Sequence, residues 1–365
     1  MAYTSIDDPS AYFQTALWTG TNAKDKVITN DGNSNLQPDL IWAKSRTSTS
    51  YTDNHFIVDS SRGRTKGIVP NATSAETTTT GNATQQAERD LQSFDTNGFT
   101  VGIVNSTAAL NAQDASLVGW QWKANGGTTS SNTDGSITST VQADTDAGFS
   151  IVTWTGNGTS GATVGHGLGV KPSHIIIRNR STSNINWTNY ASNIGATKFL
   201  QLNKTTAETT ATNRFNDTEP TTSVFSLGDS SRSNGNTSDM IAYCFAEKQG
   251  YSKFGQYIGN GNADGPFVYT GFKPAFIMGK RTNTTGNWFI MDSAREPNNV
   301  MSRRLMANTS DAESNSTTYY TDFLSNGFKL RTNVIQSNAS GSTYTFLAFA
   351  ENPFVTSTGI PTTAR

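Results

Sequence analysis

Four short sequence blocks recur three times in the same order, and this repetition constrains the fold more than any other feature of the chain. The first block, an aromatic residue followed two positions later by glycine, occurs as Trp18-Thr19-Gly20, Trp154-Thr155-Gly156 and Tyr257-Ile258-Gly259. In the second block an apolar run leads from a proline to a basic residue, from Pro38 to Lys44, Pro172 to Arg178 and Pro274 to Lys280.

The other two blocks complete the repeat. The third is an apolar and aromatic run that closes at Ser60, Ser192 and Ser293. The fourth places large residues at alternate positions, in Trp120-Gln121-Trp122, Tyr243-Cys244-Phe245 and Leu347-Ala348-Phe349. Repeats of roughly 100 residues are long enough for each unit to bury its own core. We therefore expect units at residues 1–124, 148–249 and 250–365, the last with a C-terminal tail, and a polar linker at residues 125–147.

The sequence within each unit predicts antiparallel β structure. Phe149-Ser-Ile-Val-Thr-Trp154 alternates apolar and polar residues, Ile175-Ile-Ile177 is a buried run, and Asn-Gly and Asp-Gly dipeptides mark hairpin turns. Helices are expected only as short segments near residues 85–91 and 301–306. Residues 71–87 are expected to form an exposed loop, and Ile137 with Val141 one short strand. The predicted fold class is all-β, with three tandem jelly-roll β-sandwich units.

Composition excludes several classes of function. The 27 basic and 28 acidic residues leave a net charge of −1, which argues against a basic nucleic-acid surface. No run approaches the ~20 apolar residues of a membrane span, and the N-terminus lacks the features of a signal peptide. Cys244 is the only cysteine, so no disulfide is expected within the chain. We therefore expect a soluble protein with no nucleic-acid or membrane partner.

Catalytic and metal-binding motifs are absent from the sequence. Gly165-His-Gly-Leu-Gly169 precedes an apolar strand rather than a helix, so we interpret it as a turn instead of a phosphate loop. The three histidines occupy unrelated positions of the repeat and do not form a shared ligand set. Carboxylates of the linker are interpreted as turn residues rather than Ca²⁺ ligands: these are Asp134, Asp144 and Asp146. We predict no metal and no cofactor.

Four acids recur at equivalent positions, and we interpret them as structural. Glu247 and Glu351 end corresponding strands, while Asp59 and Asp292 correspond to Ala191 in the second unit. A fold role, such as closing a strand or pairing with the basic residue of the second block, is favoured over the facing carboxylates of a glycosidase. We predict no catalytic residues.

Aromatic residues divide into a core set and a candidate binding set. Trp18, Trp154, Trp187 and Trp288 lie in the repeated blocks and are assigned to cores. The candidate binding residues are tyrosines in or beside polar stretches, where their rings are able to stack on a sugar: Tyr51, Tyr190, Tyr319 and Tyr320.

Several segments resemble a family of repeated domains of unknown function in structural proteins of tailed, mainly marine, bacteriophages. These segments are residues 132–141, 148–156, 165–172, 243–247, 251–255 and 264–272, and the resemblance extends over about residues 12 to 354. The resemblance implies concanavalin A-like, lectin-type sandwiches on the exterior of a virion, without established catalytic residues.

The expected function is therefore that of a non-enzymatic virion protein. Such a protein is a head decoration, a tail appendage or the tip of a spike or tail fibre, in contact with other virion proteins. We also expect symmetric self-association into a homo-oligomer, and weak, multivalent binding of host-surface glycans. The alternative is a phage-tail depolymerase, a glycoside hydrolase or lyase that degrades glycans.

Overall fold

The computed structural model describes residues 2–48, 53–79, 83–104 and 110–362. These residues form an all-β protein built from antiparallel sheets, as the sequence predicts, and its α-helices span four to six residues. The short helices are η1 (Pro9–Ala11), α1 (Ala83–Glu88), α2 (Thr212–Phe215), α3 (Ser231–Asn234) and α4 (Ile335–Asn338). Residues 301–306, expected to be helical, instead contribute the strand β24, so this prediction is wrong.

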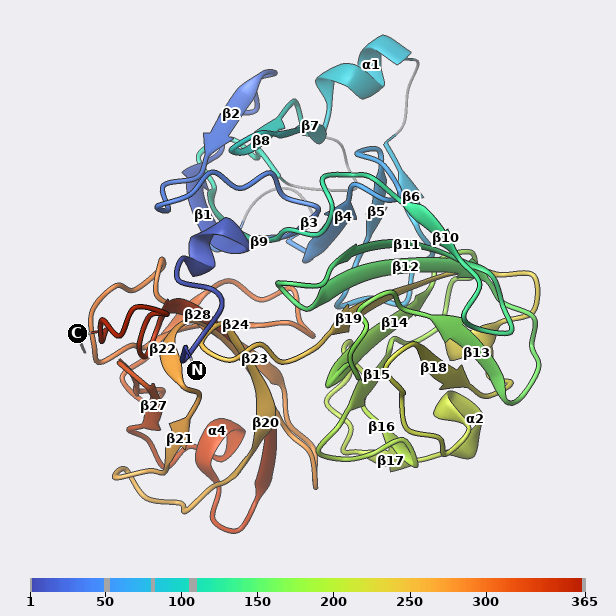
Figure 1. The fold of residues 1–365 in the computed structure, drawn as a ribbon. Coiled ribbons are helices and arrows are strands. Elements are labelled where there is room, and N and C mark those ends of the chain that lie inside the picture. Colours follow the sequence, from blue (N-terminus) through green and yellow to red (C-terminus); the bar gives the residue numbers. More distant parts are fainter. Residues whose placement is uncertain (1, 49–52, 80–82, 105–109, 363–365) are drawn as a thin grey trace.

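Three six-stranded sheets form the body of the molecule and lie around a common centre (Figure 1). The first large sheet has the order β1 (Phe13–Thr19), β9 (Ser116–Trp122), β3 (Leu40–Ser45), β4 (Phe56–Asp59), β5 (Lys66–Ile68) and β6 (Thr77–Thr78). The second has β10 (Ser130–Asn132), β11 (Ser139–Asp144), β12 (Phe149–Thr155), β19 (Asp239–Phe245), β14 (His174–Asn179) and β15 (Thr188–Ala191). The third has β20 (Ser252–Ile258), β28 (Thr343–Pro353), β22 (Phe272–Arg281), β23 (Trp288–Asp292), β24 (Arg303–Met306) and β25 (Ser314–Asn315).

Smaller sheets accompany the large ones. They are β2 (Lys26–Thr29), β8 (Gly98–Val101) and β7 (Leu91–Asp95); β13 (Ala162–Gly165) and β18 (Val224–Leu227); β16 (Lys198–Phe199) and β17 (Thr209–Thr210); and β21 (Phe267–Tyr269), β27 (Gly327–Leu330) and β26 (Thr321–Leu324). One face of the first large sheet packs on the β2-β8-β7 sheet through a core that includes Trp18, Ile41 and Phe99. Similar cores contain Trp154 with Phe225, and Ile277 with Phe328, which is consistent with β-sandwich packing.

The repeated glycine of the first block is explained by a close backbone approach. A Cβ atom on Gly20 would lie 1.9 Å from the carbonyl oxygen of Ala112. At the corresponding glycines, Gly156 and Gly259, a Cβ atom would lie 2.2 and 2.4 Å from the carbonyl oxygens of Gly235 and Ala339. Only glycine fits at these three positions, because the strand that ends there lies against the backbone of a loop that carries the carbonyl oxygen.

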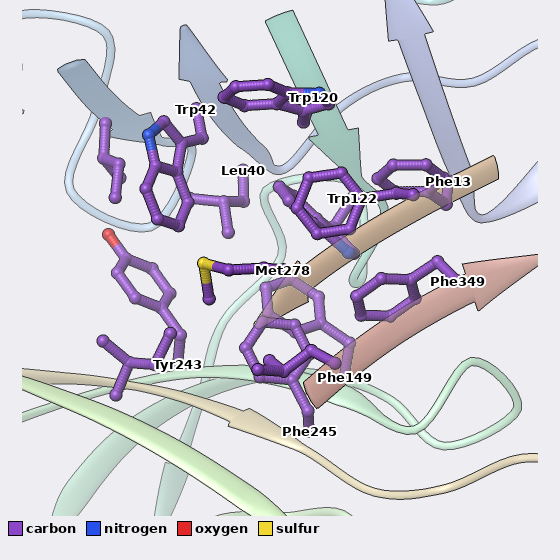
Figure 2. Close-up of a cluster of buried hydrophobic side chains, with 14 of the residues drawn as sticks. Phe13, Leu40, Trp42, Trp120, Trp122, Phe149, Tyr243, Phe245, Met278 and Phe349 are labelled. Carbon is purple, nitrogen blue, oxygen red and sulfur yellow. The ribbon is translucent and has the colours of Figure 1, made fainter. Parts of the chain in front are cut away.

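The opposite faces of the three large sheets meet in one central apolar core (Figure 2). Alternate residues of the central strands point into it, as in Trp120 and Trp122 of the first sheet, Tyr243 and Phe245 of the second, and Leu347 and Phe349 of the third. A cavity of about 20 Å³ remains at the centre of this cluster. The large sheets are thus buried on both faces, whereas the repeat pattern predicts only that each unit has its own core.

Hydrogen bonds join the three large sheets in a closed ring. In three corresponding bonds a backbone N–H of one sheet's loop donates to a carbonyl oxygen of the next: Glu76 to Arg180 at 2.8 Å, Glu208 to Thr282 at 2.7 Å, and Glu313 to Arg46 at 2.8 Å. The first sheet's loop thus reaches the second, the second's reaches the third, and the third's returns to the first. The contacts are heterologous and close after three steps, as in a cyclic trimer.

A second ring of hydrogen bonds uses the side chains four residues before Asp59, Ala191 and Asp292. Trp187 Nε1 donates to the carbonyl oxygen of Val69 at 3.2 Å, and Trp288 Nε1 donates to that of Gln201 at 2.9 Å. His55 occupies the third position, with Nε2 2.9 Å from the carbonyl oxygen of Met306.

The tautomer of His55 follows from its two partners. Its Nδ1 accepts a hydrogen bond from Trp42 Nε1 at 2.9 Å, so the proton is on Nε2, which then donates to Met306. Complete burial lowers the pKa of this histidine to about 3 and keeps it neutral. The neutral imidazole of His55 therefore donates the third hydrogen bond of the set to which the indoles of Trp187 and Trp288 contribute the other two.

The basic residues of the second block are buried and do not pair with the repeated acids. Lys280 Nζ donates to the carbonyl oxygens of Thr205 at 3.0 Å and Gly286 at 2.5 Å, and Arg178 donates to that of Ser74. Lys44 is likewise buried. Because burial disfavours the charged form, it lowers the pKa of Lys280 to about 7 and that of Lys44 to about 8.

The predicted linker is more ordered than its composition suggests. Residues 130–144 form the strands β10 and β11, which add to the open edge of β12 in the second large sheet. The sequence predicts one short strand here and the structure contains two. Residues 71–87, expected to form an exposed loop, include β6 and all of α1 except its last residue, Glu88.

Candidate functional site

The four predicted binding tyrosines do not form one site. Tyr51 lies outside the described residues. Tyr190 is on β15, fully buried, and donates a hydrogen bond to Glu219, so its ring is not available to a ligand. The prediction that Tyr190 lies in or beside a polar loop is therefore wrong, because Tyr190 is inside a strand and its ring packs against Phe215.

Tyr319 and Tyr320 are half-buried and precede β26. The guanidinium carbon of Arg304 lies 3.3 Å from the ring centre of Tyr319. Arg304 is itself buried, and desolvation lowers its pKa to about 10. One face of the Tyr319 ring is therefore covered by an internal cation–π contact rather than free for a sugar.

The structure places the repeated acids in ion pairs and in buried hydrogen-bond networks. Glu247 pairs with Lys253 at 2.8 Å and Glu351 with Lys273 at 2.9 Å, not with the basic residues of the second block. Asp59 Oδ2 accepts hydrogen bonds from Arg62 at 2.6 Å and from Tyr243 of the second large sheet at 2.7 Å.

Asp292 forms the corresponding network. Its Oδ2 accepts from Arg295 at 2.5 Å and from Trp120 of the first large sheet at 2.9 Å. In the second large sheet the same two positions hold Ala191 and Ile194. These carboxylates join different sheets, a structural role that differs from the strand closure or the pairing with the basic residue of the second block suggested by the sequence.

A surface hollow of about 370 Å³ lies beside Tyr3 and Tyr269. We call it the Tyr3–Tyr269 groove. It is lined by Tyr3, Glu247, Gln249, Ser252, Lys253, Tyr269, Thr270 and Gly271. Tyr269 ends β21, the edge strand of the smaller sheet, and is 53% exposed. An exposed ring on a rigid strand is a suitable stacking surface for a ligand.

The two tyrosines of the groove are held by hydrogen bonds. The Tyr3 hydroxyl donates to the carbonyl oxygen of Gly271 at 2.8 Å and lies 3.1 Å from the Tyr269 hydroxyl. Since Tyr3 donates to the carbonyl, Tyr269 is the donor in the contact between the two hydroxyls. Burial, and then the bond with Tyr269, raises the pKa of Tyr3, so the Tyr3 hydroxyl stays neutral at physiological pH.

The polar wall of the groove is pre-organised. Glu247 accepts hydrogen bonds from Lys253 Nζ on one oxygen and from the backbone N–H of Phe254, at 3.0 Å, on the other. Its charge is therefore balanced at the groove, and Lys253, Gln249 and Ser252 add donors and acceptors. This set suits a neutral, hydroxyl-rich ligand.

Sequence reasoning missed Tyr3 and Tyr269. The available signal is Phe267-Val268-Tyr269, where aromatic residues flank a single apolar residue. Val268 is buried, while Phe267 and Tyr269 point outward from the edge strand. A strand of three residues is too short for alternation to be recognised with certainty in advance.

Two further observations concern the described part of the chain. Within it, no cluster of three or more His, Cys, Asp or Glu side chains has the arrangement of a metal site. Asp144 instead accepts from the backbone N–H groups of Asp146 and Ala147, as expected of a turn residue. The described helices include none with the length and apolar character to cross a membrane.

Fold and groove together define an all-β protein of antiparallel sheets with an aromatic-lined surface hollow. The chain belongs to the family described as a domain of unknown function, DUF7483, whose family model matches residues 8–353. Neither a curated protein nor a solved structure matches the chain.

Proposed function

We propose that this chain is a non-enzymatic structural protein on the exterior of a tailed-bacteriophage virion, where it binds host-surface glycans. The observation that carries the binding proposal is the Tyr3–Tyr269 groove, in which an exposed aromatic ring stands beside hydroxyl, amide and charge-balanced groups. Sugars combine apolar ring faces with many hydroxyls, so this combination of surfaces is the one that a neutral glycan requires.

The architectural part of the proposal is that residues 1–124, 148–249 and 250–365 are three tandem concanavalin A-like sandwiches. Its support is the parallel between the strand orders of the first and third large sheets, together with the corresponding hydrogen bonds between sheets. Because each large sheet is buried on both faces, the molecule is rigid enough to present the groove in a fixed orientation.

The proposal includes three places on the particle. A closed body with balanced charge suits a head decoration, a tail appendage or the tip of a spike or fibre, packed against other virion proteins and further copies of itself. One groove per chain gives weak binding, and repeated copies on a particle raise the avidity.

Glycan binding is tested with purified chain on an array of bacterial surface glycans, followed by titration of the best ligand. Tyr269→Ala is expected to weaken binding about fivefold, since an aromatic contact is worth roughly 1 kcal/mol. Phe267→Ala is the matched control because Phe267 is exposed on the same strand but does not line the groove. Equal binding by both variants, or no binding by the unmodified chain, would refute the glycan proposal.

The structural role is tested separately by labelling purified virions with an antibody against the chain and imaging them. Label on the head or tail exterior supports the proposal, and absence from the particle refutes it. Release of reducing ends from a host glycan by the purified chain would instead establish the depolymerase alternative.

A further inference from the structure

In each large sheet one edge lies next to a turn of a neighbouring sheet. These edges are formed by β12, β20 and β1, and different contacts fill the space beside each of them. At the second large sheet, β11 pairs with the edge strand β12, from Thr140 opposite Thr153 to Asp144 opposite Phe149. The side chain of Gln142 in β11 donates to the hydroxyls of Ser60 at 3.0 Å and Ser61 at 2.7 Å. The added strand therefore fills the space between β12 and the turn that follows β4.

At the third large sheet the corresponding space is bridged directly. Asn193, in the turn after β15, donates to Gln256 of the edge strand β20 at 3.4 Å. The Oδ1 atom of the same Asn193 side chain accepts a hydrogen bond from the hydroxyl of Thr345 in β28 at 2.9 Å. No added strand is needed where the turn and the edge strand already meet.

At the first large sheet the corresponding space is open. A hollow of about 140 Å³ lies between β1 and the turn after β23, lined by Phe13 and Thr15 on one side and Ser293 and Ala294 on the other. The hydroxyl of Thr15 is covered and has no hydrogen-bond partner. These residues correspond to those that β11 and Gln142 contact at the second sheet, because Thr15 aligns with Ile151, which pairs with Gln142.

The backbone of β1 is ready to accept a strand on this side. Gly20 N–H donates to Ala115 and the Tyr12 carbonyl accepts from Lys123, so even-numbered residues of β1 face β9. The β1–β9 register is regular throughout. Odd-numbered residues, including Phe13, Thr15 and Leu17, therefore direct their N–H and C=O groups to the open edge. Among the described residues, no strand pairs with this edge.

We propose that the open edge of β1 is an acceptor site for an extended segment of a partner polypeptide, which adds to the first large sheet as β11 adds to the second. The segment has the pattern of β11, with a carboxamide or hydroxyl side chain opposite Thr15 that reaches the Thr15 and Ser293 hydroxyls. Strand addition supplies main-chain hydrogen bonds, and the side chain in the hollow supplies the specificity. This inference does not depend on glycan binding.

The test uses a fluorescent synthetic peptide that copies residues 138–146, titrated with the full chain by anisotropy. Saturable binding is expected, with new protection from hydrogen exchange at the amides of Phe13, Thr15 and Leu17. Loss of protection at residues 139–144 of β11, without new protection in β1, would mean that the peptide only displaces β11, and would overturn the proposal. A scrambled peptide controls for nonspecific association.

Thr15→Pro removes an outward N–H without breaking the pairing of β1 with β9, since proline is tolerated on an open edge. We expect this variant to weaken peptide binding by about tenfold or more. Thr19→Pro is the matched control, because the corresponding Thr155 lies beyond the segment that β11 covers. If Thr15→Pro is unstable by thermal unfolding, Thr15→Val tests the hydroxyl alone. Unchanged binding in both Thr15 variants would refute the site.

Discussion

A histidine in the central core provides a quantitative test of how the three large sheets pack. His174 begins β14 two residues after Pro172, at the position that Leu40 and Phe276 occupy after the other two prolines. It is buried, its ring centre lies 6.4 Å from that of Trp288, and its Nε2 has no hydrogen-bond partner. Burial alone lowers the pKa of His174 to about 3. We predict that His174→Leu raises stability.

The expected change in the free energy of unfolding for His174→Leu has two parts. At pH 7.5 the substitution removes a buried polar atom without a partner, which is worth about 1–3 kcal/mol in unfolding free energy. Below pH 6.5 the unfolded chain binds a proton at His174 that the folded chain does not bind until about pH 3. Stability therefore falls with decreasing pH by about 1.4 kcal/mol per unit in this window, or roughly 3 kcal/mol by pH 4.5.

The measurement is urea unfolding of both proteins at pH 7.5 and pH 4.5. His55 has a similarly lowered pKa, so the substitution should remove about half of the acid loss due to these two histidines. Ile176→Val, at a buried core position of the same strand, is the control: it should cost about 0.5–1.5 kcal/mol at both pH values. An unchanged difference between pH 7.5 and pH 4.5 in His174→Leu would show that His174 is not neutral and buried in the folded protein.

Three further outcomes follow from the contacts described. Arg295→Ala should lower the free energy of unfolding by about 3–5 kcal/mol because it leaves Asp292 buried without its partner, while the double variant Asp292→Ala/Arg295→Ile, which copies the second large sheet, should cost less in urea unfolding. Arginine partners, opposing desolvation, lower the pKa of Glu313 to about 2, so its stabilising contribution should be lost as pH falls from 4.5 toward 2, and Glu313→Gln should flatten acid unfolding followed by circular dichroism. Gly156→Ala should lower stability by about 1–3 kcal/mol in thermal unfolding, since the new Cβ would lie 2.2 Å from the carbonyl oxygen of Gly235.

Local patterns were sufficient to predict the all-β fold class, but not how the sheets pack together. Trp18, Trp154, Trp187 and Trp288 are buried as predicted. The run Ile175-Ile-Ile177 indicates a strand buried on both faces, yet a run of apolar residues carries no information about which distant segment covers its second face. The central core depends on that missing information.

The candidate site shows a similar division. Polar surroundings in the sequence favoured Tyr190 as exposed, but its strand position points it into the core of a sheet. Tyr3 was not recognised because its partner, Tyr269, is 266 residues away in the chain. A groove formed by segments so far apart is visible only after the chain has folded.

Ring closure within a single chain has a consequence for how the molecule can vary. A ring of three identical polypeptides would display each surface patch in triplicate, and every substitution would appear at all three places at once. Here the three equivalent places have diverged independently, as His55, Trp187 and Trp288 show. Within the residues that the structure describes, the Tyr3–Tyr269 groove and the open edge of β1 are each found at one of the three equivalent places, so the three rotational positions of an otherwise threefold object differ from one another. A binding partner that contacts either feature would fix the rotation of the molecule about the ring axis, whereas a symmetric trimer would offer it three equivalent orientations.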